Sequence, residues 1–284
     1  MKNARGFTLV EILIALVLMG IVSTALYQLL VANQRIYRAQ VESVAINESA
    51  RAAVSIVPSE VREVSAGDGD VLAMNATSLT YKSMQSLYVQ CADPNTGGLE
   101  IILDRTTSFG FRAIDAAEDS ILIFAEGDPS TRTDDGWLSA SVTSTTVGTA
   151  CPGSRPSIIV GLAGVSSSDL MNVSAGAPVR TFRPTQILLY QDGAGDWWLG
   201  GRQYQKTGGS WSTTQPLLGP LSGTGIALTY TDAAGAATAN VAAVARVGIT
   251  VQSQSSDRVY RSTGSTYLLQ NLVTQVAVRN NPTY

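Results

Sequence analysis

The sequence predicts an α+β protein in which one long N-terminal helix precedes a head built of antiparallel β-sheets. The first 66 residues contain a run without charge, at positions 12–34, and then a run without glycine or proline, at positions 35–57. After Gly69, short apolar or alternating runs are separated by Gly, Pro, Asp, Asn and Ser. Uninterrupted helix formers favour a helix, whereas short runs between turn residues favour strands.

The uncharged run is long enough to cross a membrane. As a helix, its 23 residues span roughly 35 Å, against about 30 Å for the hydrocarbon core of a bilayer. A plain signal anchor would have this composition, and Ser23-Thr24-Ala25 would also suit a secretory cleavage site. Neither alternative accounts for Glu11, because an ionisable group at the edge of an apolar span is costly without a partner.

The helix is expected to continue past the membrane and to end by residues 67–70. Val54, Val57, Val61 and Val64 share one helix face by their spacing. Pro58 falls inside this stripe, so we expect either a kink near residues 54–58 or a new short helix that starts at Pro58. The stripe should pack against the protein's own head, the alternative being neighbouring subunits.

Nine segments of the remaining chain have the composition of strands. In residues 247–251 the alternation is strict, so one face should be buried. Residues 267–278 would also suit a helix, but their valine and threonine content favours a strand. The predicted strands are 78–84, 87–91, 121–124, 157–161, 187–190, 197–204, 226–230, 245–251 and 267–278.

Composition excludes several functional classes. The chain has no histidine and two cysteines, which removes Ser-His-Asp and Cys-His catalysis, zinc sites with His ligands and four-thiolate metal sites. The net charge is −3 and no basic block is present, so nucleic-acid binding is not expected. We find no catalytic constellation and no phosphate-binding loop, so the sequence predicts neither an enzyme nor a cofactor.

The N-terminus carries a specific motif. Residues 6–11 read Gly-Phe-Thr-Leu-Val-Glu, after a short leader with Lys2 and Arg5 and before the long apolar run. This pattern resembles the processing site of type IV prepilins and type II secretion pseudopilins. The resemblance implies that a prepilin peptidase cuts between Gly6 and Phe7 and N-methylates Phe7, and that Glu11 is the carboxylate used in subunit assembly. Loss of the leader's two basic residues leaves 17 against 22 acidic ones, a net charge of −5.

A second, looser resemblance covers the C-terminal third. Residues 228–235, 244–251 and 272–280 are similar in order to the C-terminal half of PilW-like minor pilins and J-type pseudopilins, although any β-rich domain with a glycine turn would share much of the pattern. The 226 residues after Pro58 are ordinary for such minor subunits and large for a major one. Residues 95–180 resemble no family.

The resemblance implies a pilin-like organisation. Residues 1–6 would be the leader, 7–34 the membrane and filament-core half of the helix, 35–66 its exported half, and 67–284 the β-rich head. The chain would be a single-pass protein of the inner membrane with its head outside the cytoplasm. It would then join a pilus or pseudopilus near the tip, with other pilins as partners.

Three further groups of residues have a chemistry that suggests a bond or a site. In an exported head, Cys91 and Cys151 would form a disulfide, the alternative being two buried thiols. The aromatic region 196–211 fits hairpin packing better than an exposed binding ridge. Acidic loops, which fit solvated turns better than calcium sites, hold Asp68, Asp70, Glu126, Asp128, Asp134, Asp135, Asp192 and Asp196.

Two other functions remain open at this point. An adhesive or DNA-uptake subunit would use the head to grip a ligand, although the negative charge disfavours DNA. A secreted β-protein with an ordinary signal peptide would begin at Leu26 after cleavage, whereas a processed prepilin would begin at Phe7.

Overall fold

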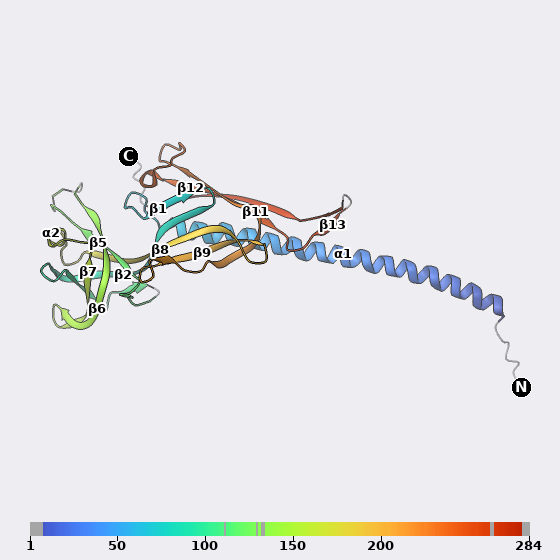
Figure 1. The fold of residues 1–284 in the computed structure, drawn as a ribbon, viewed down its shortest axis with the longest axis horizontal. Coiled ribbons are helices and arrows are strands. Elements are labelled where there is room, and N and C mark those ends of the chain that lie inside the picture. Colours follow the sequence, from blue (N-terminus) through green and yellow to red (C-terminus); the bar gives the residue numbers. More distant parts are fainter. Residues whose placement is uncertain (1–7, 111, 129, 132–133, 262–263, 280–284) are drawn as a thin grey trace, which may run out of the picture.

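The computed structural model describes residues 8–110, 112–128, 130–131, 134–261 and 264–279. A single long helix, α1, extends far beyond a β-rich head (Figure 1). The predicted fold class is therefore confirmed. The helices and strands are α1 (Leu9–Arg62), β1 (Val71–Asn75), β2 (Ser78–Asn95), β3 (Glu100–Asp104), β4 (Phe109–Gly110), β5 (Ser120–Ala125), β6 (Gly136–Cys151), β7 (Arg155–Ala163), α2 (Ser167–Leu170), β8 (Pro178–Gln191), β9 (Trp197–Gln205), β10 (Ser210–Trp211), β11 (Gln215–Thr231), the 3-10 turn η1 (Val241–Ala243), β12 (Arg246–Gln254), β13 (Val259–Arg261), β14 (Gly264–Thr266) and β15 (Leu269–Ala277).

Helix α1 runs without a break through Pro58 and ends at Arg62, with Glu63 as its C-cap. The expectation of a new helix starting at Pro58 is therefore wrong. A proline removes one helix hydrogen bond, but here Pro58 is buried against the head together with one face of the neighbouring turns. Burial of Val57 and Val61 on the same face offsets the lost bond, so the helix persists for another turn.

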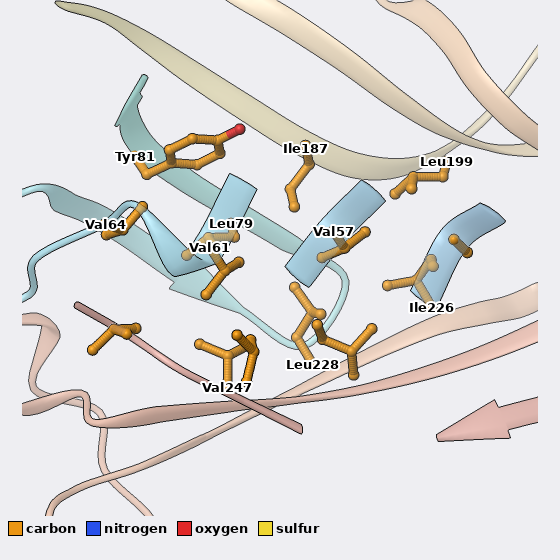
Figure 2. Close-up of a cluster of buried hydrophobic side chains, with 14 of the residues drawn as sticks. Val57, Val61, Val64, Leu79, Tyr81, Ile187, Leu199, Ile226, Leu228 and Val247 are labelled. Atoms are coloured by element: carbon orange, nitrogen blue, oxygen red, sulfur yellow. The ribbon is translucent and has the colours of Figure 1, made fainter. Parts of the chain in front are cut away.

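The C-terminal quarter of α1 packs into the part of the head nearest the helix, which we call the helix-proximal lobe. Val57, Val61 and Val64 are at most 2% exposed and pack with side chains of the surrounding sheet (Figure 2). The valine stripe thus packs against the protein's own head, as expected. The sheet residues of this core include Leu79, Tyr81, Ile187, Leu199, Ile226, Leu228 and Val247.

The far end of the head is a closed barrel, which we call the distal lobe. Its strands pair in the order β2-β3-β7-β6-β5-β8, and β8 pairs again with β2, so the sheet returns to its start. All six pairings are antiparallel. A second core fills it, with Ile101, Leu103, Ile121, Ile123 and Val160 fully buried. Closure removes the unpaired edges that an open sheet of this size would expose.

The two lobes share β2 and β8. The first half of β2 pairs with the second half of β8, from Ser78 opposite Leu188 to Met84 opposite Phe182, and this part belongs to the helix-proximal lobe. A register shift follows between Met84 and Ser86, after which the strands enter the barrel. The chain between them, which resembled no family, therefore forms most of the distal lobe (Figure 1).

All nine predicted strands lie in or overlap strands of the structure. The ambiguous segment 267–278 is strand β15, which pairs along its whole length with β12. Three principal strands were not predicted, namely β1, β3 and β6. The most extended of these, β6, is rich in serine, threonine and glycine and exposed along much of its second half, so it lacks a regular alternation of apolar side chains.

Candidate processing and assembly segment

Gly6 and Phe7, the residues of the expected cleavage site, lie outside the described residues. Thr8 is the first described residue, and it is the N-cap of α1. The Thr8 backbone N–H donates to the Glu11 carboxylate at 2.9 Å and its hydroxyl does so at 3.0 Å, while the Glu11 backbone N–H donates to the hydroxyl at 3.3 Å. This reciprocal arrangement is a capping box, which satisfies donors that a helix N-terminus leaves free.

The capping box gives Glu11 a partner that sequence reasoning did not consider. The motif implies that Glu11 serves subunit assembly, and in the structure Thr8 holds its carboxylate. The capping contact therefore lies one residue along the sequence from Phe7, the expected new N-terminus.

The N-terminal part of α1, from Leu9 to Leu30, is apolar with Glu11 as its one charged residue, and we call it the bare segment. Its large apolar side chains are exposed on every side of the helix, from Leu9 at 77% to Leu30 at 56%. In the described part of the chain, α1 is the one helix long and apolar enough to cross a membrane. The exposed residues are Leu9, Val10, Ile12, Leu13, Ile14, Leu16, Val17, Leu18, Met19, Ile21, Val22, Leu26, Tyr27, Leu29 and Leu30.

A helix that is apolar all round needs an apolar environment on all sides. A contiguous exposed surface of this extent is far larger than a soluble monomer usually carries. The side chains of this segment therefore fit the interior of a bilayer or a bundle of equivalent helices. Either environment would remove them from water at about 25 cal/mol per Å².

The bare segment gives way to a docked one between Arg35 and Ile46, because the head contacts Arg35 and Glu42, and Ile46 is only 5% exposed. Polar contacts then hold the helix to the head. The Ser49 hydroxyl donates to the Gly219 carbonyl at 2.9 Å, and the Tyr81 hydroxyl donates to Glu60 at 2.7 Å. Burial and the neighbouring Glu60 carboxylate raise the pKa of Tyr81 well above its ordinary value, so the phenol stays a donor. The bare and docked parts are thus one continuous rod attached to the head at one end.

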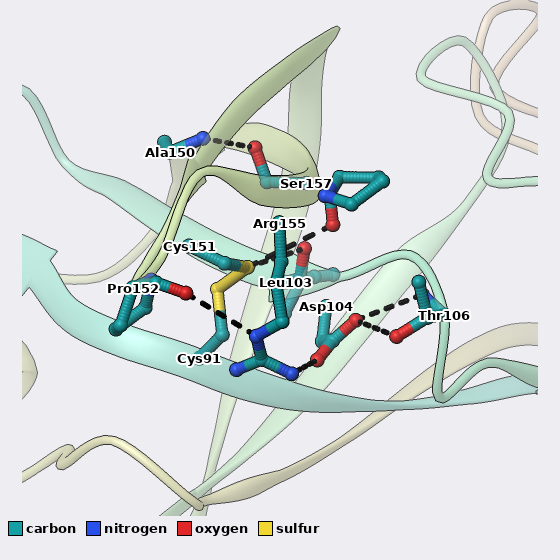
Figure 3. The surroundings of a disulfide bond; sticks show 10 residues. Cys91, Leu103, Asp104, Thr106, Ala150, Cys151, Pro152, Arg155 and Ser157 are labelled. Carbon is teal, nitrogen blue, oxygen red and sulfur yellow. Dashed lines mark hydrogen bonds and ion pairs between the residues drawn. A yellow bond between two sulfur atoms is a disulfide. The ribbon is translucent and has the colours of Figure 1, made fainter.

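The predicted disulfide is present. Cys91 and Cys151 are bonded, with their Cα atoms 5.4 Å apart, and they link β2 to the end of β6 within the distal lobe (Figure 3). Beside it, Asp104 accepts from the Thr106 hydroxyl at 2.6 Å and from Arg155 at 2.6 Å. The Thr106 hydrogen bonds, assisted by Arg155, lower the pKa of Asp104. The bridge closes a loop of 60 residues.

An ion network that sequence reasoning missed joins the two lobes. Asp119 is fully buried and accepts hydrogen bonds from Arg112 and from Arg183, the latter at 2.8 Å. Burial opposes its ionisation, but the hydrogen bonds from Arg112, the Asp115 backbone and Arg183 outweigh burial and lower the pKa of Asp119. Lys206, from the end of β9, donates to three carbonyls around this loop at 2.7–3.1 Å. No spacing in the sequence signals these contacts, because their members come from distant segments.

The acidic loops have mixed outcomes. Asp192 accepts from the backbone of Ala194 and Asp196, and from the Trp198 indole at 2.8 Å, so it stabilises its own turn. Asp70, by contrast, is only 2% exposed and lies 3.4 Å from Arg180, so the expectation of a solvated turn is wrong there. Burial raises the pKa of Asp70.

Metal ligation and the aromatic region can also be judged from the geometry. Within the described ranges, His, Cys, Asp and Glu side chains form no group of three or more that could hold a metal ion. Tyr204 and Trp211 face each other across the β9–β10 pairing with ring centroids 5.6 Å apart, and Trp197 packs against the helix-proximal core. The region is hairpin and core packing, as expected.

Comparison with known families bears on the N-terminus alone. Residues 1–27 match the family described as the prokaryotic N-terminal methylation motif. The chain carries a prepilin-type N-terminus. This match implies processing by a prepilin peptidase and assembly with other pilins. Neither a curated protein nor a solved structure matches the chain.

Proposed function

We propose that this protein is a non-enzymatic filament subunit that is inserted in a membrane as a prepilin, cut at Gly6–Phe7, N-methylated on Phe7 and assembled with other pilins. One observation carries the proposal. The helix that begins with the methylation motif exposes its apolar side chains from Leu9 to Leu30, and its C-terminal part contributes to the core of the head. A helix built in this way holds its apolar part available for a bilayer and then for neighbouring subunits.

Moving from bilayer to filament requires no refolding of the head. The docked part of α1 contributes Ala53, Val57 and Val61 to the helix-proximal core, so pulling on the helix moves the head with it. Charge before and after the span is nearly balanced, with Lys2 and Arg5 on one side and Arg35 and Arg38 on the other. The disulfide supports a head outside the cytoplasm, since such bonds persist in oxidising compartments.

Within this function, we assign the chain to the minor subunits near the filament tip, with PilW-like minor pilins and J-type pseudopilins as the relevant types. A head with an added barrel is bulky for a subunit repeated along a whole filament. The segments that support the resemblance are also neighbours in the structure, because β12 lies between β11 and β15. Glu11 is present, as expected for a subunit that follows another in assembly.

The mature N-terminus tests the proposal. The full chain is expressed with an active prepilin peptidase, and its N-terminal peptide is identified by mass spectrometry. A prepilin gives N-methylated Phe7, and Gly6→Val leaves the chain uncut because a branched side chain occupies the cleavage position. Gly20→Val is the matched control, since a side chain at Gly20 meets no atom within 4 Å and lies outside the cleavage motif. A chain that starts at Leu26, or that stays uncut with the native Gly6, would refute the proposal.

A further inference from the structure

One part of the head leaves the rest and follows α1 toward its N-terminus. Strands β13 and β14 form a hairpin that lies along the helix beyond the rest of the head (Figure 1). The Ser256 backbone N–H donates to the Glu42 carboxylate at 3.0 Å. A small core of Ile46, Val259 and Leu268 attaches the hairpin to the helix. The hairpin is therefore a docked extension of the head with a defined position along α1.

The hairpin reaches the first charged residue after the apolar span. The Arg35 guanidinium lies 4.6 Å from the centroid of the Tyr260 ring, a cation–π contact. Beyond Tyr260 the strand continues to Arg261, whose backbone pairs with Gly264. The contacts at Glu42 and then at Arg35 show that the hairpin runs toward the apolar end of the helix as it approaches its turn.

Helix geometry places this contact at the depth of lipid headgroups. A hydrocarbon core of about 30 Å takes roughly 20 helical residues. Counted from Ile12, the first residue of the uncharged run, the core ends near Val31. The headgroup region adds about 5–7 Å, which is four or five more residues. Arg35 falls in this layer, and Tyr260 lies beside it.

The side chains at this level and just beyond it suit such a layer. Tyr37 is 67% exposed and Tyr260 60% exposed, and tyrosine is enriched where a membrane meets water. Arg35, Arg38 and Arg258 are exposed as well, and the long side chains of Arg38 and Arg258, which lie farther from the apolar span, can extend toward the headgroups. Arginine at this depth attracts anionic headgroups, while its apolar stem packs against the acyl boundary.

The acidic residues nearby do not cancel this charge. Asp257 is exposed, but it stands against three arginines. Glu42 lies one helical turn beyond Arg38, and its carboxylate accepts the Ser256 N–H. The surface therefore combines two exposed tyrosines with a net positive charge.

We propose that, in the membrane-anchored precursor, the β13–β14 hairpin rests on the bilayer surface and binds anionic lipid headgroups through Arg35, Arg38, Arg258 and Tyr260. The inference rests on the proposed membrane-anchored state and goes beyond it, because it assigns a lipid-binding surface to the head. The contact sets the tilt of the head before extraction. It is lost when the helix leaves the bilayer.

Spin labels on the full chain in lipid nanodiscs test the inference. The native cysteines are bonded to each other, so one added cysteine can be labelled alone. Ser265→Cys places the label on the exposed strand opposite Tyr260, and Thr145→Cys places it on the exposed surface of the distal lobe as the matched control. Ala25→Cys reports whether the span is inserted. Accessibility to oxygen and to a water-soluble nickel complex is measured for each label.

In nanodiscs with phosphatidylglycerol, the label at position 265 should show a several-fold higher ratio of oxygen to nickel accessibility than the label at position 145. The ratio should fall in nanodiscs of phosphatidylcholine alone. Arg258→Gln should reduce the docked population relative to the undocked one by about five-fold, the contribution of one arginine near an anionic surface. Thr149→Gln, a polar change on the distal lobe, should leave it unchanged.

The outcomes separate this inference from the proposed function. A buried label at position 25 with a water-exposed label at position 265 would overturn the lipid contact and leave the anchored precursor intact. Protection of position 265 only after partner pilins are added would also overturn the lipid contact, since the hairpin would then be a subunit contact. A water-exposed label at position 25 would overturn both.

Discussion

The buried carboxylate of Asp119 offers the sharpest test of how the head is held together. It is fully buried, and two guanidinium groups, Arg112 at 32% exposure and Arg183 at 17%, donate to it. Asp119→Asn keeps the shape of the side chain but removes the charge. Arg112 would then lack its carboxylate partner, whereas Arg183 would keep Asp115, which lies 2.7 Å from its guanidinium.

The expected loss can be worked from these exposures. Removing one partner of a buried ion pair costs about 3–5 kcal/mol, because the remaining charge is left uncompensated. Arg112 can recover part of its hydration and the asparagine oxygen still accepts one bond, so we expect about 3 kcal/mol. For a head of this size, that corresponds to a decrease of roughly 6–12 °C in Tm.

The pH dependence has a definite sign. Because folding lowers the pKa of Asp119, its contribution to stability is present above the unfolded pKa of about 3.9 and is lost as the pH falls through the folded pKa. At low pH the native carboxyl becomes neutral and resembles the amide. The difference in stability between native chain and variant should therefore be large near neutral pH and shrink below about pH 4.

Denaturant unfolding of the full chain in detergent, followed by tryptophan fluorescence from about pH 7 to about pH 3, measures this difference. Asp128→Asn is the matched control, since Asp128 is exposed and an asparagine can still accept the Ser130 N–H of its turn. A loss below about 1 kcal/mol for Asp119→Asn near pH 7 would refute the reasoning. So would a difference that stays constant as the pH falls.

Three further outcomes are expected. Glu11→Ala should be cut normally but poorly incorporated into filaments, and incorporation of Glu11→Asp should fall between that of Glu11→Ala and that of the native chain. Thr8→Ala, which loses only the capping hydroxyl, should be incorporated better than Glu11→Ala. Equal amounts of Thr8→Ala and Glu11→Ala in sheared filaments would mean that Glu11 acts only as a helix cap. Replacing Cys91 and Cys151 by serine should lower the free energy of unfolding by about 4 kcal/mol in the chain-entropy model. An unchanged free energy of unfolding would mean that the bridge does not restrict the unfolded chain. Val61→Ala, at a site 1% exposed, should cost about 2–3 kcal/mol in denaturant unfolding, and a neutral result would mean that the helix is not part of the core.

The local features of this protein could be read from the sequence because each depends on neighbouring residues. The uncharged run, the motif around Gly6 and the 3-4-3 spacing of the valines are all contained within single segments. Strands with regular apolar side chains, such as β12, were recognisable for the same reason. The strand β6 was not, because its ladder partners rather than its own side chains hold much of it in place.

The sequence by itself determined a prepilin-type N-terminus, one long apolar helix and a β-rich head, since composition and periodicity are properties of the chain. Only the tertiary structure decided which partners meet across long separations. The closure of the distal barrel by β2 and β8, the burial of Asp119 between arginines from two segments, and the contact of Tyr260 with Arg35 are of this kind. Strand pairing leaves no periodic signal for its partner, and an ion pair can join any two points that the fold brings together.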